Sequence, residues 1–230
     1  MSEQRDLSGA TDTPQPPPAP SPEVMRVEYG GFTLDEATAA DDPFEQFRRW
    51  FDDAVRGGGL EANAMVLATV DSEGRPRQRT VLLKGVDEAG FTFFTNYSSA
   101  KAQQIAATGQ VSLLFGWHHQ HRQVIVSGTA EQISAEENRR YFSRRPRGSQ
   151  LAAWASRQSR ELTGRSELDE AFADAARRFP DEVPVPDGWG GFRVTPVTIE
   201  FWQGRTNRLH DRLMYRVDGD GRWQVARLAP

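Results

Sequence analysis

The segment from Arg208 to Arg212 carries basic side chains at alternate positions, Arg208, His210 and Arg212. We expect this segment to belong to a strand, and alternation along a strand points the three side chains to one face of a sheet. Basic groups packed this closely repel one another, so a neighbouring anion such as a phosphate would explain the pattern. The spacing alone is equally compatible with a solvated strand face that binds nothing.

A second group of polar side chains follows a predicted helix start. Residues 134–137 have the capping-box pattern, and Tyr141 and Arg145 lie one turn apart beyond them. Ser149 shares their face only if the helical direction continues past Pro146, which proline disfavours. A phenol, a guanidinium and a hydroxyl on one face could clamp a phosphate. Two alternatives stay open: a basic helix face without a ligand, and a nucleic-acid patch, which the acidic composition disfavours.

Other basic residues also lie where they could meet anions. Ser98 can cap a helix through residue 107, which places Ser98, Ser99 and Lys101 at a helix N-terminus that attracts phosphate. Arg79 and Lys84 are five residues apart on a predicted strand. They therefore point to opposite faces unless a bulge or the strand end intervenes. Each of these signals is weak by itself.

Three of the four histidines, His118, His119 and His121, occur together. They fall at the tip of a predicted hairpin with no carboxylate nearby in the sequence, so we expect no bound metal. The chain also lacks the Gly-x-Ser-x-Gly, Walker and Gly-x-Gly-x-x-Gly patterns. The residues alone thus indicate a β-rich domain with two or three clusters of basic side chains, each able to bind a phosphate.

Short strands are the main elements that would position these groups. A first helix should begin at Asp42-Pro43, because aspartate caps a helix and proline suits its first turn, and should end at Gly57. Turn-like sequences between the first three predicted strands indicate that these are adjacent and antiparallel. Many short strands and few helices predict a mainly β fold with peripheral helices, a closed or nearly closed antiparallel barrel. The predicted strands are 64–70, 78–84, 91–95, 111–117, 123–133, 191–203, 208–217 and 223–228, and the further helices are 98–107, 134–144 and 166–179.

Composition limits the classes of protein that the chain can belong to. Its 230 residues, 37% hydrophobic, suffice for one domain, for which we take residues 25–230. Residues 1–24 are proline-rich and are predicted to be a disordered tail, with a PxxP-like ligand as the alternative. A net charge of −4 and a pI of about 5.7 argue against non-specific nucleic-acid binding. With no cysteine and no apolar run of membrane-spanning length, we expect a cytoplasmic protein whose redox chemistry would need a bound cofactor.

Taken together in chain order, the motifs resemble those of the pyridoxamine 5'-phosphate oxidase family, from about residue 26 to the last residue. The many matches in one order make this a specific signal, which no single motif provides. The matching stretches are 63–66, 78–84, 94–96, 111–115 with Trp117, 122–124, 141–142, 145–147, 149–150, Trp154, 158–159, 189–193, 200–204, 208–212 and 227–230.

The resemblance implies an FMN-binding split β-barrel that works as a homodimer, with FMN between the subunits. The implied activity is oxidation of pyridoxamine 5'-phosphate and pyridoxine 5'-phosphate by O2 to pyridoxal 5'-phosphate, releasing hydrogen peroxide and, from the amine, ammonia. Carried over position by position, the FMN contacts would be Arg79, Thr80, Val81, Leu82, Leu83, Lys84, Phe94, Thr95, Ser99, Lys101, Gln123, Gln158, Ser159, Trp202 and Arg212. The substrate contacts would be Lys84, Tyr141, Arg145, Ser149, Arg26, Tyr29, Arg208 and His210, with Arg208 and His210 as the catalytic residues.

Two positions depart from the family pattern. Ala100 stands where the family often has a basic residue, so a contact to the FMN phosphate would be missing and FMN retention weaker. Phe94 stands where tyrosine is frequent. The alternatives to the oxidase are a split-barrel flavin or deazaflavin reductase, and a carrier that binds flavin or pyridoxal phosphate without turnover.

Overall fold

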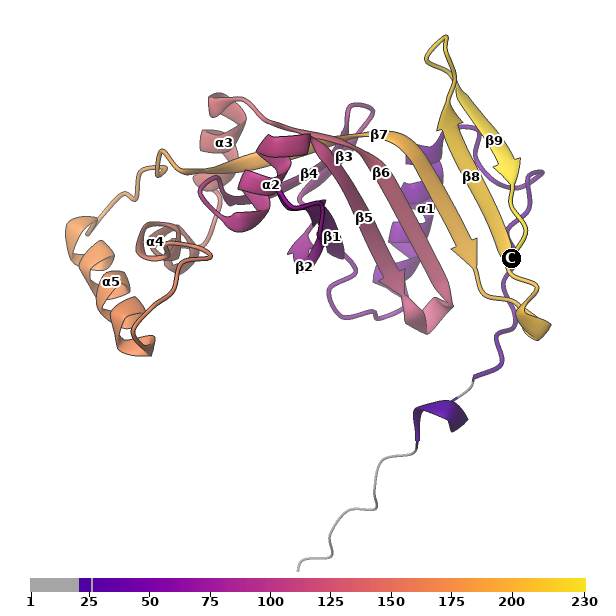
Figure 1. Ribbon diagram of the computed structural model, residues 1–230, viewed down its shortest axis with the longest axis horizontal. Helices are drawn as coiled ribbons and strands as arrows, with labels where there is room; N and C mark the ends of the chain where they lie inside the picture. The colour runs from indigo at the N-terminus through magenta and orange to yellow at the C-terminus, as the bar shows by residue number, and fades with distance from the viewer. Residues whose placement is uncertain (1–20, 26) are drawn as a thin grey trace, which may run out of the picture.

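The structure is a computed structural model that describes residues 21–25 and 27–230. Within them, nine strands form one antiparallel sheet that curls into half of a barrel (Figure 1). The strand order is β2-β1-β5-β6-β7-β4-β3, and β8 and β9 extend the sheet from β7. The strands are β1 (Ala64–Val70), β2 (Pro76–Leu82), β3 (Gly85–Asp87), β4 (Gly90–Asn96), β5 (Gln110–Trp117), β6 (Arg122–Gln132), β7 (Trp189–Gln203), β8 (Asp211–Val217) and β9 (Trp223–Arg227).

The longest strand, β7, organises the sheet. Along one edge it pairs with β6, and along the other its first half pairs with β4 and its second half with β8. The helices lie around the sheet: α1 (Pro43–Arg56), α2 (Ala100–Thr108), α3 (Ala135–Phe142), α4 (Arg147–Ala155) and α5 (Arg165–Arg178). Short 3-10 turns occur at η1 (Pro22–Val24), η2 (His118–Gln120) and η3 (Thr206–Arg208). Figure 1 shows α4 and α5 at one end of the sheet and the β8–β9 hairpin at the other.

The main core lies between α1 and the concave side of the sheet. Phe47 is fully buried, and its ring centroid lies 4.9 Å from those of Phe91 and Phe115. The side chain of Asp42 accepts a hydrogen bond from the backbone of Phe44, as expected of an N-cap. A second, smaller core joins α3, α4 and α5 to the start of β7. The two cores hold the two ends of β7 in separate surroundings.

The mainly β fold with peripheral helices is confirmed, and most predicted elements are found within a few residues of their expected bounds. The capping box of Ser134 and Glu137 is present. The predicted adjacency of the second and third strands is wrong, because the short strand β3 pairs with β4 while β2 pairs only with β1. The N-cap of α2 is Ser99 rather than Ser98.

Two further predictions concern segments of the site. The helix that begins after Ser134 ends at Phe142, and α4 starts afresh behind Pro146, so proline breaks the helix as its chemistry requires. The predicted strand 208–217 begins only at Asp211. The predicted disordered tail, residues 1–24, lies outside the described residues except for 21–24, of which 22–24 form η1.

Candidate functional site

A cavity of about 600 Å³ lies between β2, β4 and the segment that joins α3 to α4. Five basic side chains line it, and no aspartate or glutamate does. None of the five has an ion-pair partner among residues 21–25 and 27–230. The predicted residues that it brings together are Arg79, Thr80, Val81, Leu82, Lys84, Phe94, Thr95, Lys101, Tyr141, Arg145, Ser149 and Gln158. An uncompensated positive cavity of this size suits phosphate-bearing ligands.

Lys101 and Arg79 form one wall of this cavity. The Lys101 ammonium donates to Gln158 Oε1 at 2.7 Å and to Thr95 Oγ1 at 3.2 Å. The Arg79 guanidinium donates to Thr69 Oγ1 at 2.6 Å. Burial, and then the nearby charge of Arg79, lower the pKa of Lys101. Both cations are therefore held by neutral oxygens, which position them without neutralising their charge.

Arg145 has an unused donor. Its Nη1 is buried and lacks a hydrogen-bond partner, and burial lowers the pKa of the guanidinium. The guanidinium lies over the ring of Trp189, 4.8 Å from the centroid. The Tyr141 ring is stacked on Phe94 at 3.9 Å, and Phe94 is stacked on Trp189 at 5.2 Å. A buried donor without an acceptor costs about 1–3 kcal/mol, so its position in a cavity wall indicates that a ligand supplies the acceptor.

The sequence left open whether Arg79 and Lys84 could share a site. Both line the cavity, because β2 ends at Leu82 and Lys84 follows the strand rather than continuing its alternation. Ser149 joins Tyr141 and Arg145 although the helix is broken at Pro146, since α4 starts anew and returns its first turn to the same cavity.

A second cavity, of about 460 Å³, lies beside the opposite end of β7. Tyr29, Gln123, Trp202, Arg208 and His210 line it together with residues of the segment 22–28. His210 Nδ1 accepts a hydrogen bond from the backbone N–H of residue 205 at 3.0 Å, and its ring centroid lies 4.6 Å from that of Trp202. With Nδ1 accepting, the proton of the neutral imidazole lies on Nε2, which is then a hydrogen-bond donor.

Arg208, His210 and Arg212 do not share one strand face, so that prediction is wrong. Asn207 and Arg208 have φ angles of 56° and 61°, in the left-handed region, and these turn the chain before β8 begins. Arg208 is exposed in η3. Arg212 is in β8, where its guanidinium binds both carboxylate oxygens of Glu200 at 2.7 and 3.2 Å. Arg212 lines neither cavity.

Three other predicted positions lie at the edges of the site. Leu83 is buried beside the first cavity, and Ser99 is fully buried with its Oγ near the Lys101 ammonium. Ser159 Oγ accepts from the backbone N–H of Ala100 at 3.2 Å. Arg26 lies outside the described residues. The sequence did not single out Arg144 and Trp189, which line the first cavity, or Arg205, which lines the second.

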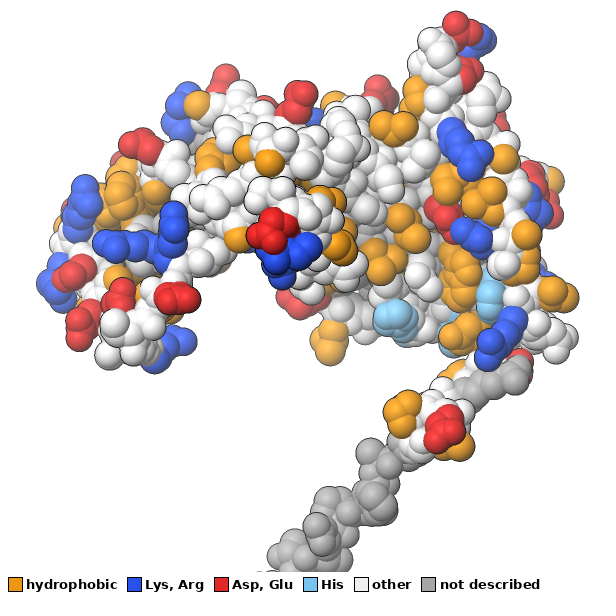
Figure 2. All heavy atoms as spheres, in the orientation of Figure 1, with side chains coloured by type: hydrophobic (Ala, Val, Ile, Leu, Met, Phe, Trp, Pro, Cys, Tyr) orange, Lys and Arg blue, Asp and Glu red, His pale blue; other side chains and the backbone are white. Residues whose placement is uncertain are grey.

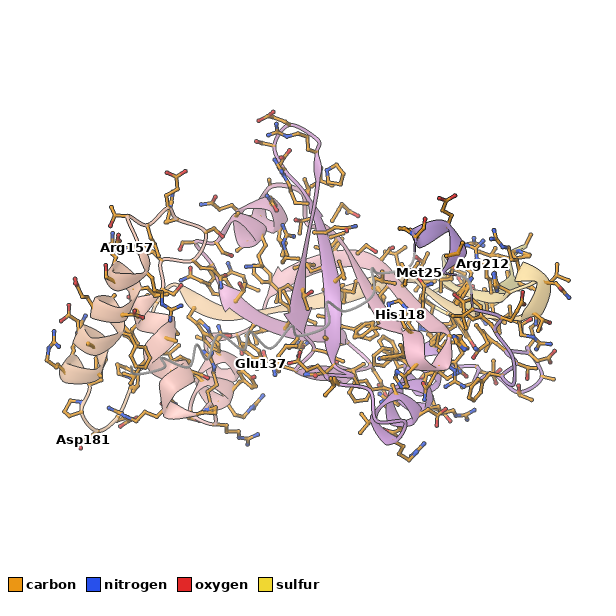
Figure 3. The ribbon with its side chains drawn as sticks, turned by 90° about the horizontal axis from the view of Figure 1, so that it is seen from below. Met25, His118, Glu137, Arg157, Asp181 and Arg212 are labelled. Carbon is orange, nitrogen blue, oxygen red and sulfur yellow. The ribbon has the colours of Figure 1, made fainter. Side chains whose placement is uncertain are left out.

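The two cavities are far apart in one chain. Trp189 lines the first and Trp202 the second, and these residues stand at opposite ends of β7. Thirteen steps of a strand span about 40 Å at about 3.3 Å per residue. Figure 3 likewise shows Met25 and Arg212 at one end of the molecule and Arg157 and Asp181 at the other. One chain therefore carries two separate candidate cavities.

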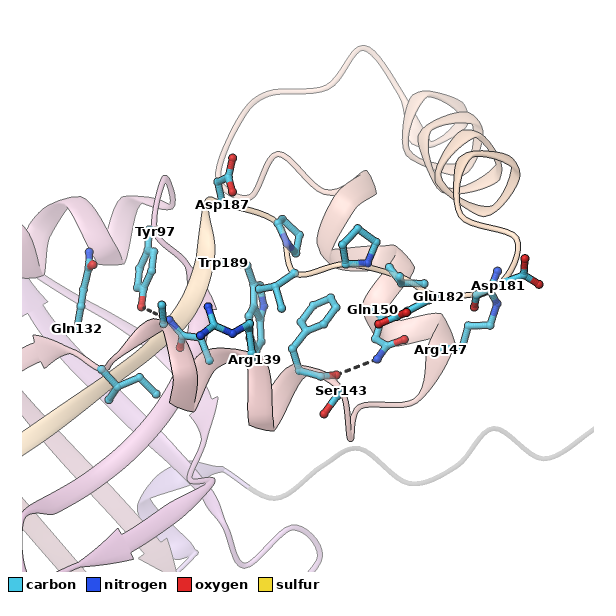
Figure 4. A pocket seen from close by; sticks show the side chains of 18 residues that line it. Tyr97, Gln132, Arg139, Ser143, Arg147, Gln150, Asp181, Glu182, Asp187 and Trp189 are labelled. Carbon is cyan, nitrogen blue, oxygen red and sulfur yellow. Dashed lines mark hydrogen bonds between the residues drawn. The ribbon is translucent and has the colours of Figure 1, made fainter.

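A cavity of about 970 Å³, larger than these two, lies between α3, α4 and the segment 181–187 (Figure 4). Several polar groups in its wall already form hydrogen bonds with other groups of the protein. Arg147 donates to the carbonyls of Phe179 and Asp181, and Asn138 bonds both Gly191 N–H and the Tyr97 hydroxyl. It contains none of the predicted site residues. The cationic cavity is the better candidate because no acidic side chain lines it and the Arg145 Nη1 donor in its wall has no acceptor.

Some functions find no support in the described residues. No group of three or more histidine, cysteine, aspartate or glutamate side chains there could hold a metal ion. Within the same residues, no helix is long and apolar enough to cross a membrane. Basic and acidic side chains are interspersed over the face shown in Figure 2, without one broad basic surface.

Comparison with known proteins gives consistent matches over nearly the whole chain. Residues 51–179 match the family described as pyridoxamine 5'-phosphate oxidase, and residues 189–230 match the pyridoxine 5'-phosphate oxidase C-terminal dimerisation region. A pyridoxine/pyridoxamine 5'-phosphate oxidase of Streptomyces avermitilis is 51% identical over 219 residues, 93% of this chain and 98% of the relative. One of Rubrobacter xylanophilus is 55% identical over 207 residues, 90% of this chain and 95% of the relative.

Solved structures agree on the fold. PhzG from Burkholderia lata 383, in complex with tetrahydrophenazine-1-carboxylic acid, superposes with a TM-score of 0.81 at 30% identity, covering 86% of this chain and 98% of that one. A pyridoxamine 5'-phosphate oxidase-related, FMN-binding protein of Nostoc punctiforme has a TM-score of 0.66 at 19% identity, covering 80% of this chain and 97% of that one. The second likeness concerns the fold alone.

Proposed function

Because the chain belongs to the pyridoxamine 5'-phosphate oxidase family, we propose that it oxidises pyridoxamine 5'-phosphate and pyridoxine 5'-phosphate to pyridoxal 5'-phosphate, with FMN as cofactor and O2 as acceptor. The observation that carries the proposal is the cavity lined by five basic residues and no acidic one, with the unused donor of Arg145 in its wall. Substrate and cofactor each bear a phosphate monoester, which is close to a dianion at neutral pH. Two such groups need about four positive charges.

The cationic side chains divide between the two phosphates by position. Arg79 and Lys101, with Thr95 and Gln158, form the wall that would hold FMN. Lys84 and Arg145, with Tyr141 and Ser149, would grip the substrate phosphate. Since neutral partners already fix Arg79 and Lys101 and the Arg145 guanidinium lies over the Trp189 ring, little ordering of these three side chains remains to oppose binding.

A homodimer completes the site. The matched C-terminal dimerisation region begins at Trp189 and includes β7, β8 and β9. In one chain β7 keeps the Arg145 cavity and the His210 cavity about 40 Å apart. A second copy related by a two-fold axis brings the His210 cavity of one subunit to the Arg145 cavity of the other. FMN would then be held between the subunits, with Gln123 and Trp202 as its contacts in the second cavity.

The residues of the second cavity orient the substrate. When bound, FMN supplies the hydride-accepting chemistry at the C4' carbon of the vitamer. Arg208 and His210 would orient the substrate for this reaction, and the Nε2–H of His210 would be free to donate to it because Nδ1 accepts from the backbone N–H of residue 205. The phosphate grip at the other end of the substrate fixes the distance between the two contacts.

Oxygen consumption tests the proposal. We expect the purified protein to be yellow, and pyridoxamine 5'-phosphate to drive O2 uptake and hydrogen peroxide formation. Unphosphorylated pyridoxamine should react far more slowly, since it leaves the cationic wall unpaired. A reductase would need a nicotinamide or deazaflavin donor, and a carrier would bind the vitamer without O2 uptake. Either result would refute the oxidase proposal.

A phenazine precursor is the useful competing substrate, because PhzG was solved with tetrahydrophenazine-1-carboxylic acid. Such a compound has a carboxylate but no phosphate. The Lys84 and Arg145 cluster favours a dianionic phosphate over a monoanion. Oxidation of this compound in preference to pyridoxamine 5'-phosphate would assign the chain to a different substrate class.

A further inference from the structure

Tyr29 is held at the second cavity by an unusual partner. Its ring centroid lies 4.3 Å from that of His121, with the rings tilted by 31°. It also approaches Trp202 edge-on at 6.1 Å and His210 at 5.9 Å. Trp202 and His210 are walls of the cavity, whereas His121 is not among its lining residues. His121 therefore contacts Tyr29 from outside the site.

The backbone fixes the place of His121. The residue ends the β5–β6 connection with φ of 54°, and its carbonyl accepts hydrogen bonds from Gly204 N–H at 2.7 Å and Gln203 Nε2 at 3.2 Å. These bonds tie the connection to the end of β7, next to the turn that carries Arg208. The imidazole thus has a defined position relative to the cavity.

Gly204 makes the contact sterically feasible. A Cβ at that position would lie 2.6 Å from Tyr29 Cδ2 and 2.9 Å from His121 Cβ. Non-bonded carbon atoms do not approach each other this closely, so any side chain at position 204 would displace one of the two rings. The absence of a side chain here leaves room for Tyr29 to lie against both His121 and the cavity wall.

We propose that His121 is a positioning residue that holds Tyr29 in place over the vitamer bound between Arg208 and His210. This inference rests on the proposed function. Tyr29 belongs to the segment 27–32, which is mostly exposed, so ring contacts largely determine where its phenol lies. Removing one aromatic partner should weaken substrate binding by about two- to tenfold, the factor that corresponds to one aromatic pair.

A double-mutant cycle tests the proposal in the holoenzyme. His121→Ala should raise the KM for pyridoxamine 5'-phosphate about two- to tenfold and leave kcat within about a factor of two. In a Tyr29→Ala background the same substitution should add nothing, since its effect passes through Tyr29. His121→Phe should restore the KM. His118→Ala is the matched control, because it removes an imidazole from the same connection without touching Tyr29.

A contact measurement makes the outcome independent of activity. The chain has four tyrosines, so incorporation of 3-fluorotyrosine gives a simple fluorine spectrum in which Tyr29→Phe assigns the Tyr29 resonance. His121→Ala should shift that resonance and His118→Ala should not. Additive effects on KM, or an unshifted resonance, would overturn the inference. Absence of O2 uptake in the wild type would instead overturn the proposed function, and the spectrum would still decide the contact.

Discussion

Replacing Arg145 by methionine should separate binding from stability. Methionine keeps much of the aliphatic bulk but removes the guanidinium, whose Nη1 is buried without a partner. One charge-assisted hydrogen bond to a phosphate is worth about 1.5–3 kcal/mol, so the KM for pyridoxamine 5'-phosphate should rise about 10- to 150-fold. The FMN content should change little, because in the proposed site Arg79 and Lys101 would hold the other phosphate.

The ligand-free protein should respond differently. Losing the contact of the guanidinium with the Trp189 ring, 4.8 Å away, costs about 0.5–2 kcal/mol. Removing an unsatisfied buried donor regains about 1–3 kcal/mol. In the free energy of unfolding the two effects nearly cancel or leave the variant slightly more stable. Since 1 kcal/mol corresponds to about 2–4 °C, the midpoint of thermal unfolding of the apoprotein should stay the same or rise by a few degrees.

Arg122→Met is the matched control. Arg122 is equally an arginine over a tryptophan, Trp50 at 4.5 Å, but its donors are used by Gln203 Oε1 and Asp53 Oδ2, both at 2.9 Å. Asp53 is partly exposed, so we take the low end of the cost of breaking a buried pair, about 3 kcal/mol, which lowers the midpoint by about 6–12 °C. The reasoning fails if Arg145→Met destabilises as much as Arg122→Met, or if its KM is unchanged.

Three further outcomes follow from the site and its surroundings. Ala100→Arg should lower the FMN dissociation constant about tenfold in a fluorescence titration, and an unchanged constant would place the phosphate elsewhere. Arg208→Ala should depress turnover with little loss of bound FMN, and unaltered kinetics would remove it from catalysis. Although burial raises it, hydrogen bonds from Arg122 and then Arg56 hold the pKa of Asp53 below its ordinary 3.8. The carboxylate therefore stabilises the fold above about pH 4 and ceases to do so as the pH falls through its folded-state pKa. Asp53→Asn should accordingly weaken urea resistance at pH 6 by an amount that shrinks as the pH is lowered below about 4, and a loss that does not change with pH would refute the linkage.

Local chemistry made several elements predictable. Residues 64–70 form a strand with the expected bounds because the segment is a short, almost continuous apolar run that contains β-branched residues, bounded by turn-like sequence. The start of α1 followed from Asp42-Pro43, and the start of α3 from its capping box, because both patterns satisfy the free N–H groups of a first helical turn. Each of these patterns lies within a few consecutive residues, so it can be recognised without knowing any long-range contact.

The candidate site was less predictable because it depends on distant contacts and on backbone angles. The types of residues 208–212 are compatible with a strand, but Asn207 and Arg208 adopt left-handed angles that no spacing rule indicates. The stack of Phe94 on Tyr141 and Trp189 joins three separate elements. No pattern in the sequence predicted that Trp189 would line the cavity. The strand 191–203 was predicted, but the separation of the two cavities was not, because no pattern in the sequence indicates which cavity each end of β7 borders.

The length of β7 has a genetic consequence. If each complete site draws the Arg145 cavity from one subunit and the His210 cavity from the other, two differently damaged chains can compensate each other. A hybrid of an Arg145-deficient chain and a His210-deficient chain carries one doubly damaged site and one intact site. Alleles that are inactive alone would then regain up to half of normal activity per hybrid pair, so a mutation at one end of this strand has to be judged by the chain with which it is co-expressed.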